Sequence, residues 1–264
     1  MALFTREAES GSADAMGWMG SMYLLGHGAP MDIQRGVTLI QASAQNKSPV
    51  GMRFMGVIYL QGNGVPQDYV LARTYFKKAI AAGDVPAYGR LGMMSIMGLG
   101  AAPDYQAGKA LLQKGSDLGD PWAMVELGRA YASGSQRNPD YKAALALFEK
   151  GASLGNRLAA FRAGRLYEQG KGVQASLPKA AAYYLQASKK GHSGAQTALC
   201  HLYQRGEGVP RDPVMAYSLC SLAAEAGDQT AQIDLHSLAL EMTPQQQDEA
   251  IAAKPLIFRE KTSK

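Results

Sequence analysis

Residues 159–191 read AAFRAGRLYEQGKGVQASLPKAAAYYLQASKKG and contain one complete structural unit. Small and apolar residues at helical spacing lead into a Gly-x-Gly segment, and a second helical pattern then ends at Gly191. Gly164 recurs every 36 residues back to Gly20, Cys200 replaces it one period onward, and three other positions recur with the same period. The four series are Gly20, Gly56, Gly92, Gly128 and Gly164; Tyr23, Tyr59, Tyr131, Tyr167 and Tyr203; Gly26, Gly62, Gly98, Gly134, Gly170 and Gly206; and Asp32, Asp68, Asp104, Asp140 and Asp212.

A fixed period of this length indicates stacked supersecondary units, each of which packs only on its neighbours. The sequence therefore predicts an all-α repeat solenoid of about six 36-residue units with a C-terminal capping helix. We expect residues 1–14 to form a partial N-terminal repeat that consists of its second helix. Residues 15–230 should form the six repeats, and residues 231–264 a C-terminal cap and tail.

Each unit is predicted to contain two helices joined by a glycine turn. Glycine inside a helix is less favourable than alanine by about 1 kcal/mol, so its recurrence in the first helix indicates close approach of the second. The expected contacts on the second helix are Gly36, Ala72, Gly108, Ala144, Ala180 and Ala216. The aspartates should cap the second helices, and the Gly-x-Gly segments should adopt left-handed conformations.

The C-terminal end of the array carries its own signals. Thr243 is a suitable N-cap, Pro244 occupies the first helical position, and Gln246 completes a capping box. A last polar helix is therefore predicted from about Pro244 to Ala253. The tail from Leu256 to Lys264 begins with apolar residues and ends with charged ones, so it either folds back or frays.

Composition excludes several classes of protein. A hydrophobic content of 47% with 19% charged residues is typical of a folded chain. The formal net charge of +5 is spread along the sequence and lacks the clustered basic stripe of nucleic-acid binders. No apolar run is long enough to span a membrane, and the opening MALFTREAESG lacks the pattern of a signal peptide.

The units resemble the Sel1-like repeat, a relative of the tetratricopeptide repeat. The resemblance covers nearly the whole chain and rests on several kinds of run. These are Leu127–Tyr131 and Ala163–Tyr167, Gly-x-Gly-Val at 62–65, 170–173 and 206–209, KKAIAAG at 77–83, and the closing MTPQQQDEA at 242–250, which is similar to the ending of bacterial members. The sequence departs from the family at Ser135-Gln136-Arg137 and at Ser176, where we expect changes confined to local turn geometry.

The resemblance implies right-handed superhelical α-hairpins whose first helices line a concave face. It also implies protein–protein adaptor work in signalling, envelope biogenesis, secretion or host contact. Some bacterial members resemble immunity proteins encoded beside type VI secretion lipase toxins. A bacterial protein of this kind would be periplasmic if an export signal preceded Met1, and cytoplasmic otherwise.

Cys200, His201 and His236 are the best candidates for an enzymatic site. Equivalent positions of adjacent units lie about 10 Å apart, which is long for ligands of one metal, and further ligands at suitable spacing are missing. We therefore predict no catalytic residue, no metal and no cofactor. Cys200 occupies the glycine series and is interpreted as a buried thiol. A bridge to Cys220, in the aromatic series of the paired helix, is the alternative.

The first helices change in character along the chain. The resemblance places residues just before and after the tyrosine series in the groove, where the first three units are apolar and the last three polar. The predicted partner-binding residues are Leu24, Val57, Leu60, Met93, Ile96, Met97, Arg129, Arg165, His201 and Arg205. An exposed apolar patch with a charged rim is typical of a partner site, and arginines in one series can grip carboxylates. Alternatively, the apolar residues contact the loops or cap beneath them. Trp18, Phe54, Trp122 and Phe161 lie on the same helices, as anchors or as core.

The sequence thus favours a non-enzymatic protein-binding solenoid that acts through its concave groove. The most concrete form is a bacterial adaptor or an immunity-type inhibitor of a secreted effector or toxin, with type VI lipase immunity as its sharpest version. A cell-envelope assembly scaffold or signalling regulator is the alternative, and a hydrolase-like enzyme is disfavoured by the missing catalytic constellation. We expect another protein as partner, no nucleic acid, no integral membrane segment and a monomer.

Overall fold

The computed structural model describes residues 2–133 and 138–253, and its regular structure within them is entirely α-helical, as predicted. The chain divides into two compact units, Met1–Leu127 and Gly128–Lys264. The predicted irregular turn at 135–137 and the tail from Leu256 lie outside the described residues. The helices are α1 (Ala2–Glu9), α2 (Ala13–Leu25), α3 (Ile33–Gln45), α4 (Pro49–Gln61), α5 (Tyr69–Ala81), α6 (Pro86–Met97), α7 (Tyr105–Asp117), α8 (Pro121–Ser133), α9 (Tyr141–Ser153), α10 (Arg157–Gln169), α11 (Leu177–Ser188), α12 (Ser193–Arg205), α13 (Pro213–Glu225), α14 (Gln229–Glu241) and α15 (Pro244–Ala253).

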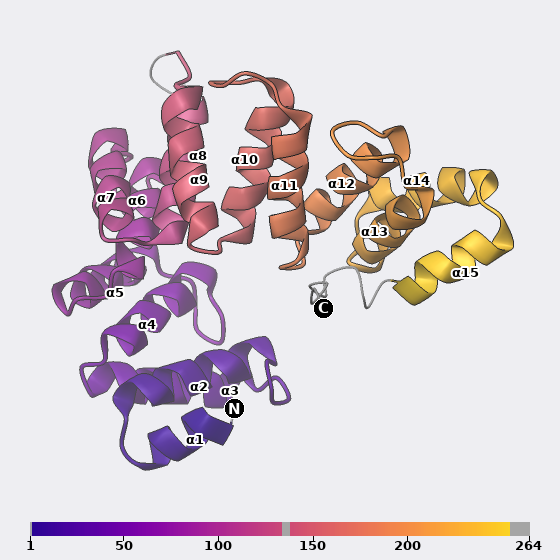
Figure 1. Ribbon diagram of the computed structural model, residues 1–264. Coiled ribbons are helices and arrows are strands. Elements are labelled where there is room, and N and C mark those ends of the chain that lie inside the picture. The colour runs from indigo at the N-terminus through magenta and orange to yellow at the C-terminus, as the bar shows by residue number, and fades with distance from the viewer. Residues whose placement is uncertain (1, 134–137, 254–264) are drawn as a thin grey trace. The chain divides into compact units, whose positions relative to one another are not determined.

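Within each unit the helices form consecutive antiparallel hairpins (Figure 1). In unit 1 the first helices α2, α4 and α6 pack on the second helices α3, α5 and α7, and each second helix contacts the next first helix. Unit 2 repeats this arrangement from α9 to α14, and α15 packs against α13. Helix α8 contains the division between the units. The predicted hairpin repeat is therefore present in both units.

The predicted helix caps are confirmed at the start of the second helices. The side chains of Asp32, Asp68, Asp104, Asp140 and Asp212 each accept a hydrogen bond of 2.9 Å from the backbone N–H three residues later. Ser176 replaces aspartate in the fifth unit and caps α11 through its hydroxyl. At the C-terminus, Thr243 and Gln246 exchange backbone-to-side-chain bonds as a capping box. The capping residues therefore make the hydrogen bonds that the sequence predicted.

Lys47 occupies a position at which the other repeats have glycine. At the end of the second helix the equivalent positions are glycines with positive φ, such as Gly83 and Gly119, both at +91°. Lys47 adopts the same left-handed conformation with φ of 61°, which is unfavourable for a residue with a Cβ by about 1 kcal/mol. We therefore expect Lys47→Gly to stabilise the protein by about 1 kcal/mol, observed as a rise of about 2–4 °C in the thermal midpoint.

Gly119→Lys is the matched reverse substitution. A Cβ at Gly119 would meet no atom within 4 Å, so its only penalty is conformational and its thermal midpoint should fall by a similar amount. A Lys47→Gly protein that melts at or below the wild-type temperature would contradict this reading of the turn.

The in-helix glycines do allow close approach, but their contacts differ from the predicted ones. A Cβ at Gly20, Gly92 or Gly164 would meet the carbonyl oxygen of Gly36, Gly108 or Ala180, as expected. At three positions, Gly164 included, an aromatic ring of the second helix fills the space above the glycine. The contacts are Gly56 with Phe76, Gly128 with Phe148, and Gly164 with Tyr184. Side chains 20 residues onward, Ile40 and Leu112 included, therefore contact this glycine in each of the first five repeats.

The sixth repeat replaces this contact with a covalent bond. Cys200 occupies the glycine position, and a disulfide joins it to Cys220, 20 residues onward, with a Cα–Cα distance of 5.6 Å. Both cysteines are fully buried. The interpretation of Cys200 as a buried free thiol was therefore wrong. Two cysteines substitute together for a glycine and a large side chain, and so preserve the contact between α12 and α13.

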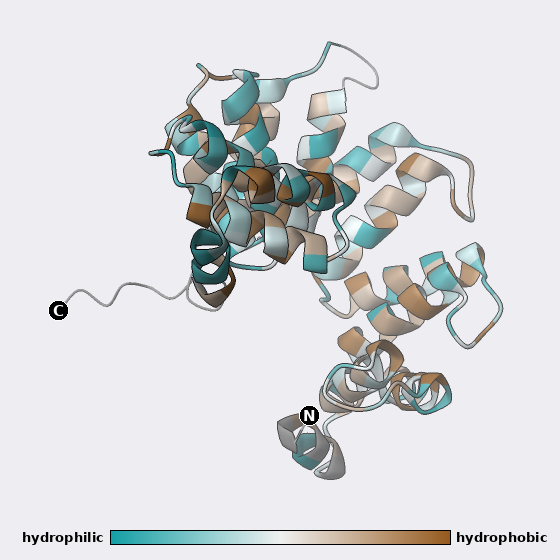
Figure 2. Ribbon diagram, turned by 90° about the vertical axis from the view of Figure 1, so that its right-hand side faces the viewer, coloured by the Kyte–Doolittle hydropathy of each residue, from teal (hydrophilic) through white to brown (hydrophobic). Residues whose placement is uncertain are grey.

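Hydropathy follows the hairpin packing. Figure 2 shows hydrophobic and hydrophilic residues mixed along most helices. Small residues at the starts of the first helices, such as Ala87, Ala123 and Ala159, are fully buried. Among the described residues, no helix combines the length and the apolar character needed to cross a membrane.

Candidate functional site

The first helices leave one face uncovered by their hairpins. On each of α2, α4, α6, α10 and α12, four positions separated by steps of four, three and four residues are exposed or half-buried. We call this surface the first-helix face of each unit. In unit 1 it comprises Asp14, Trp18, Ser21, Leu25, Val50, Phe54, Val57, Gln61, Pro86, Arg90, Met93, Met97 and Trp122. In unit 2 it comprises Arg129, Ser133, Leu158, Arg162, Arg165, Gln169, Gly194, Ala198, His201 and Arg205.

Seven of the ten predicted partner-binding residues lie on these faces. They are Val57, Met93 and Met97 in unit 1, and Arg129, Arg165, His201 and Arg205 in unit 2. Met97 is 58% exposed, and Leu25 at the equivalent position of the first repeat is 60% exposed. Apolar side chains this open to solvent gain free energy when a partner covers them.

The other three predicted residues face their own hairpins. Leu24 and Ile96 are half-buried and lie against Gly36 and Gly108 of the paired helix. Leu60 packs on the cluster that contains Phe76, and Val57 on the first-helix face packs on it too. These positions contribute to the contact between first and second helices, so the apolar part of the predicted groove is narrower than the sequence alone indicates.

Aromatic rings connect the helices on the face of unit 1. Trp18, which is 40% exposed, lies edge-on to Phe54 with ring centroids 5.2 Å apart. Phe4 of α1 stacks on the other side at 6.5 Å. The Cζ atom of Arg53 lies 4.5 Å from the Phe54 ring centroid and 5.5 Å from that of Trp18, as in cation–π contacts. Trp18 and Phe54 thus pack on neighbouring helices, and their role as anchors for a partner stays a prediction.

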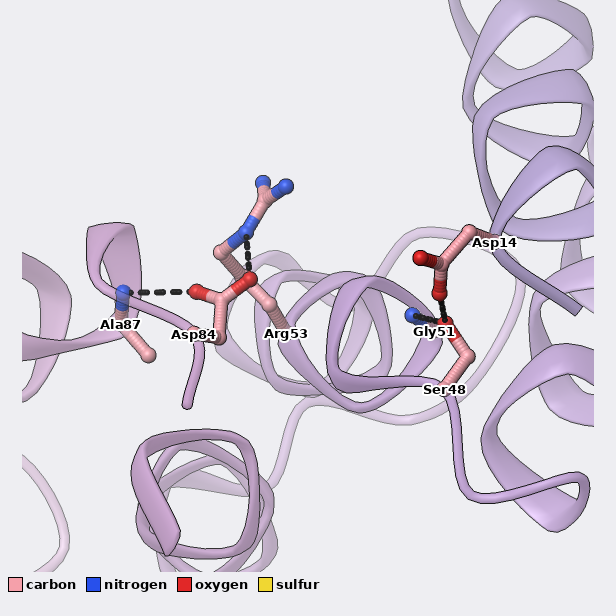
Figure 3. Close-up of polar contacts among 6 residues, drawn as sticks. All are labelled: Asp14, Ser48, Gly51, Arg53, Asp84 and Ala87. Atoms are coloured by element: carbon pink, nitrogen blue, oxygen red, sulfur yellow. Dashed lines mark hydrogen bonds and ion pairs between the residues drawn. The ribbon is translucent and has the colours of Figure 1, made fainter. Parts of the chain in front are cut away.

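The carboxylate that caps the following first helix orients Arg53. Nε of Arg53 donates a 3.0 Å hydrogen bond to Asp84, whose other oxygen accepts the backbone N–H of Ala87 at the start of α6 (Figure 3). Ser48 links Asp14 to Gly51 in the same manner one repeat earlier. Polar contacts between consecutive repeats therefore run through the helix caps.

A second arginine on this face stacks on the second tryptophan. Cζ of Arg90 lies 4.4 Å from the Trp122 ring centroid. Burial lowers the pKa of Arg90, and the positive charge of Arg53 lowers it further, although an arginine stays protonated in proteins. Burial also raises the pKa of Asp120, against the effect of two backbone N–H groups that it caps. Neither Arg53 nor Arg90 was selected by sequence analysis.

The face of unit 2 is basic. Arg165 is exposed and makes no hydrogen bond or ion pair with the described residues. His201 is held by Asp234 of α14 at 2.6 Å, and Arg205 pairs with Glu207 at 2.9 Å. Phe161 stacks on the ring of His192 with centroids 4.3 Å apart, so this predicted anchor packs against the residue that caps α12.

The enzymatic candidates are not brought together. Cys200 is bonded to Cys220, His201 is bonded to Asp234, and His236 is exposed on α14. In the described part of the chain, no group of three or more His, Cys, Asp or Glu side chains could hold a metal ion.

The chain matches a known family of repeat proteins. The Sel1 repeat model matches residues 13–48, 49–84, 85–120, 123–156, 157–192 and 193–228. No curated protein sequence matches the chain significantly. A Sel1 repeat protein from Oxalobacter formigenes is 26% identical, with a TM-score of 0.73 over 91% of this chain and 99% of its own.

Two further structures are similar. A protective antigen of uropathogenic Escherichia coli strains, with an SLR fold, is 31% identical over 94% of this chain, with a TM-score of 0.64. The chain spans only 54% of that protein's length. An immunity protein from Pseudomonas aeruginosa is 21% identical over 83% of each chain, with a TM-score of 0.61, a likeness that concerns the fold.

Proposed function

Because the chain belongs to the Sel1 repeat family, a solenoid fold for protein interaction, we propose that its first-helix faces capture another protein. The most concrete form of this function is a bacterial adaptor or an immunity-type inhibitor that binds a secreted effector or toxin. A type VI secretion lipase is the sharpest candidate for that toxin. The exposure of Met97 and Leu25 at equivalent positions of one face is the observation that carries the proposal.

Two properties of the chain support an inhibitor. Unit 1 carries exposed apolar side chains and unit 2 carries exposed arginines such as Arg165, and methionine and arginine are each enriched at protein interfaces. An immunity protein of Pseudomonas aeruginosa has the same fold. The binding residues that we propose are Val57, Met93, Met97, Arg129, Arg165, His201 and Arg205.

The disulfide supports an exported location. Structural disulfides persist in oxidising compartments such as the bacterial periplasm, and are rare in the cytosol. The Cys200–Cys220 bond is fully buried at the centre of the α12–α13 hairpin. We therefore propose that the protein meets its partner in the periplasm.

Surface variants test the proposal. Wild-type protein is used to capture partners from the exported fraction of the source bacterium, and the captured protein is identified and titrated. Met97→Asp should weaken its binding by about 10–100-fold, because one exposed apolar side chain contributes about 1.5–3 kcal/mol when fully buried. Arg165→Glu should slow association most at low ionic strength, where screening is weak.

Matched controls lie on a second helix of unit 1 and at the end of a second helix of unit 2. Val70 on α5 is 62% exposed, and Lys189 follows α11 and is exposed. Val70→Asp and Lys189→Glu should leave binding unchanged. Equal binding by all four variants would refute the proposed faces. Co-expression with the captured protein then decides between functions, because neutralised toxicity supports an inhibitor and an envelope-assembly partner supports the scaffold alternative.

A further inference from the structure

The face of unit 1 carries more N–H donors than the chain supplies with acceptors. An arginine has five N–H donors in a planar fork. Arg53 uses Nε for Asp84, and Figure 3 shows its two terminal nitrogens directed away from that carboxylate. Arg90 makes no hydrogen bond or ion pair within the residues that the structure describes. Both guanidiniums lie against aromatic rings, and the side chain of Arg53 is 13% exposed.

The neighbouring carboxylates are committed elsewhere. Asp84 is 6% exposed and accepts from both Ala87 and Arg53, while Asp120 is 6% exposed and accepts two backbone N–H groups at the start of α8. A carboxylate that left its cap to pair with Arg90 would leave helix N–H groups unsatisfied. Neither aspartate could therefore be recruited by the remaining donors of the two arginines without loss of a helix cap.

Partial burial raises the free-energy cost of leaving these donors without an acceptor. Arg90 is half-buried on Trp122, and its pKa is lowered first by burial and then by Arg53. The nearby charges of Asp120 and Glu126 raise the pKa of Arg90 without pairing with it, and an anion that reaches the guanidinium directly relieves the penalty of burial further. A carboxylate can accept two parallel N–H bonds from a guanidinium, and this bidentate pair is stronger than a hydrogen bond between neutral groups.

We propose that Arg53 and Arg90 bind carboxylates of an acidic segment in the captured protein. A neighbouring apolar side chain of that segment packs on Trp18, Phe54 and Met93. The surroundings favour a peptide over a nucleic acid, because the half-buried apolar side chains of Phe54 and Met93 on this face suit a segment that combines acidic and apolar residues. This inference rests on the proposed function and specifies the partner chemistry of one part of the face.

The chain contains its own reporters of this subsite. Its two tryptophans are Trp18 and Trp122, and both belong to the proposed surface. A segment that covers them should change tryptophan emission, and the change should vanish with the binding. The signal therefore distinguishes occupation of this surface from binding to unit 2, which contains no tryptophan.

A random-peptide phage library selected on the immobilised full chain provides the probe. Selected peptides should be enriched in Asp and Glu beside aromatic or aliphatic residues, and should change the tryptophan emission. Arg90→Gln should weaken them about tenfold or more, the loss expected for a hydrogen bond between charged groups. Arg53→Gln should act in the same direction. Lys77→Gln, an exposed site on α5, removes the same charge and should have no effect.

The outcomes separate this inference from the proposed function. Arg90→Gln should keep the wild-type thermal midpoint within about 2–4 °C, equivalent to about 1 kcal/mol, since the side chain has no acceptor to lose. If the midpoint falls further, Arg90→Lys, which keeps the charge but not the planar fork, is used as the test variant instead. Selection of neutral or basic peptides, or of none, overturns the inference, as does tighter binding of a single-stranded oligonucleotide to these arginines. Acidic peptides that respond to Arg165→Glu but not to Arg90→Gln overturn it too, while the proposed function stands.

Discussion

Reduction of the Cys200–Cys220 bond should lower the free energy of unfolding of unit 2 by about 3 kcal/mol. The bond joins residues separated by 20 positions, and closing a loop of this length removes about that much conformational freedom from the unfolded chain. Both sulfurs are fully buried, so the native hairpin has to open before a reductant can reach them. The effect is therefore expected in denaturant titrations in which folded and reduced unfolded chains equilibrate.

Urea unfolding followed by helical circular dichroism, with and without reductant, measures this difference. The variant Cys200→Ala/Cys220→Ala is the matched control. It should unfold at the lower urea concentration of the reduced protein, and reductant should not shift it further. Two alkylatable thiols in unreduced, urea-unfolded protein would show that the bond is absent and would remove the argument for an oxidising compartment.

The parts of the fold that could be predicted from sequence depend on local chemistry. Asp32 caps α3 because a carboxylate at that position reaches the N–H of residue 35 whatever surrounds it. Gly83 follows α5 because a left-handed φ of +91° favours glycine in any context. A 36-residue period then extends each local signal to the other repeats, so the hairpins and their order could be read directly.

The candidate site depends on the direction in which each side chain points. A 36-residue period gives no information about that direction. One residue along a helix turns the side chain by about 100°. Leu25 is therefore 60% exposed, while Leu24 lies half-buried against Gly36. The apolar character of both positions is the same, and only the direction of the paired helix separates a binding residue from a packing residue.

Arg53 and Arg90 were missed for a related reason. They do not belong to one series, because the residue 36 positions after Arg53 is Gly89 and the residue 36 positions before Arg90 is Phe54. Comparing equivalent positions therefore never pairs them. What relates them is the stacking of each on an aromatic residue of the face, which emerges only when adjacent helices are placed side by side.

Cys220→Phe alone should be the most destabilising of the substitutions considered. A ring at position 220 would point at Cys200, which fills the space that Gly128 leaves free for Phe148. Overpacking of this kind costs about 1–3 kcal/mol, and the lost disulfide adds about 3 kcal/mol. The free energy of unfolding should therefore fall by roughly 4–6 kcal/mol, measured by urea titration of the single variant.

Adding Cys200→Gly to that variant should restore most of the loss. The glycine is unfavourable in the helix by about 1 kcal/mol, but it frees the space for the ring, whose burial contributes about 1.5–3 kcal/mol. The sixth repeat would then have the packing of the fourth, Gly128 with Phe148, and its stability should no longer respond to reductant. If the double variant is no more stable than Cys220→Phe, the cysteine pair does not stand in for the glycine–ring contact. Recovery would instead show that two chemically unrelated pairs, each 20 residues apart, solve the same packing problem between the helices of a repeat.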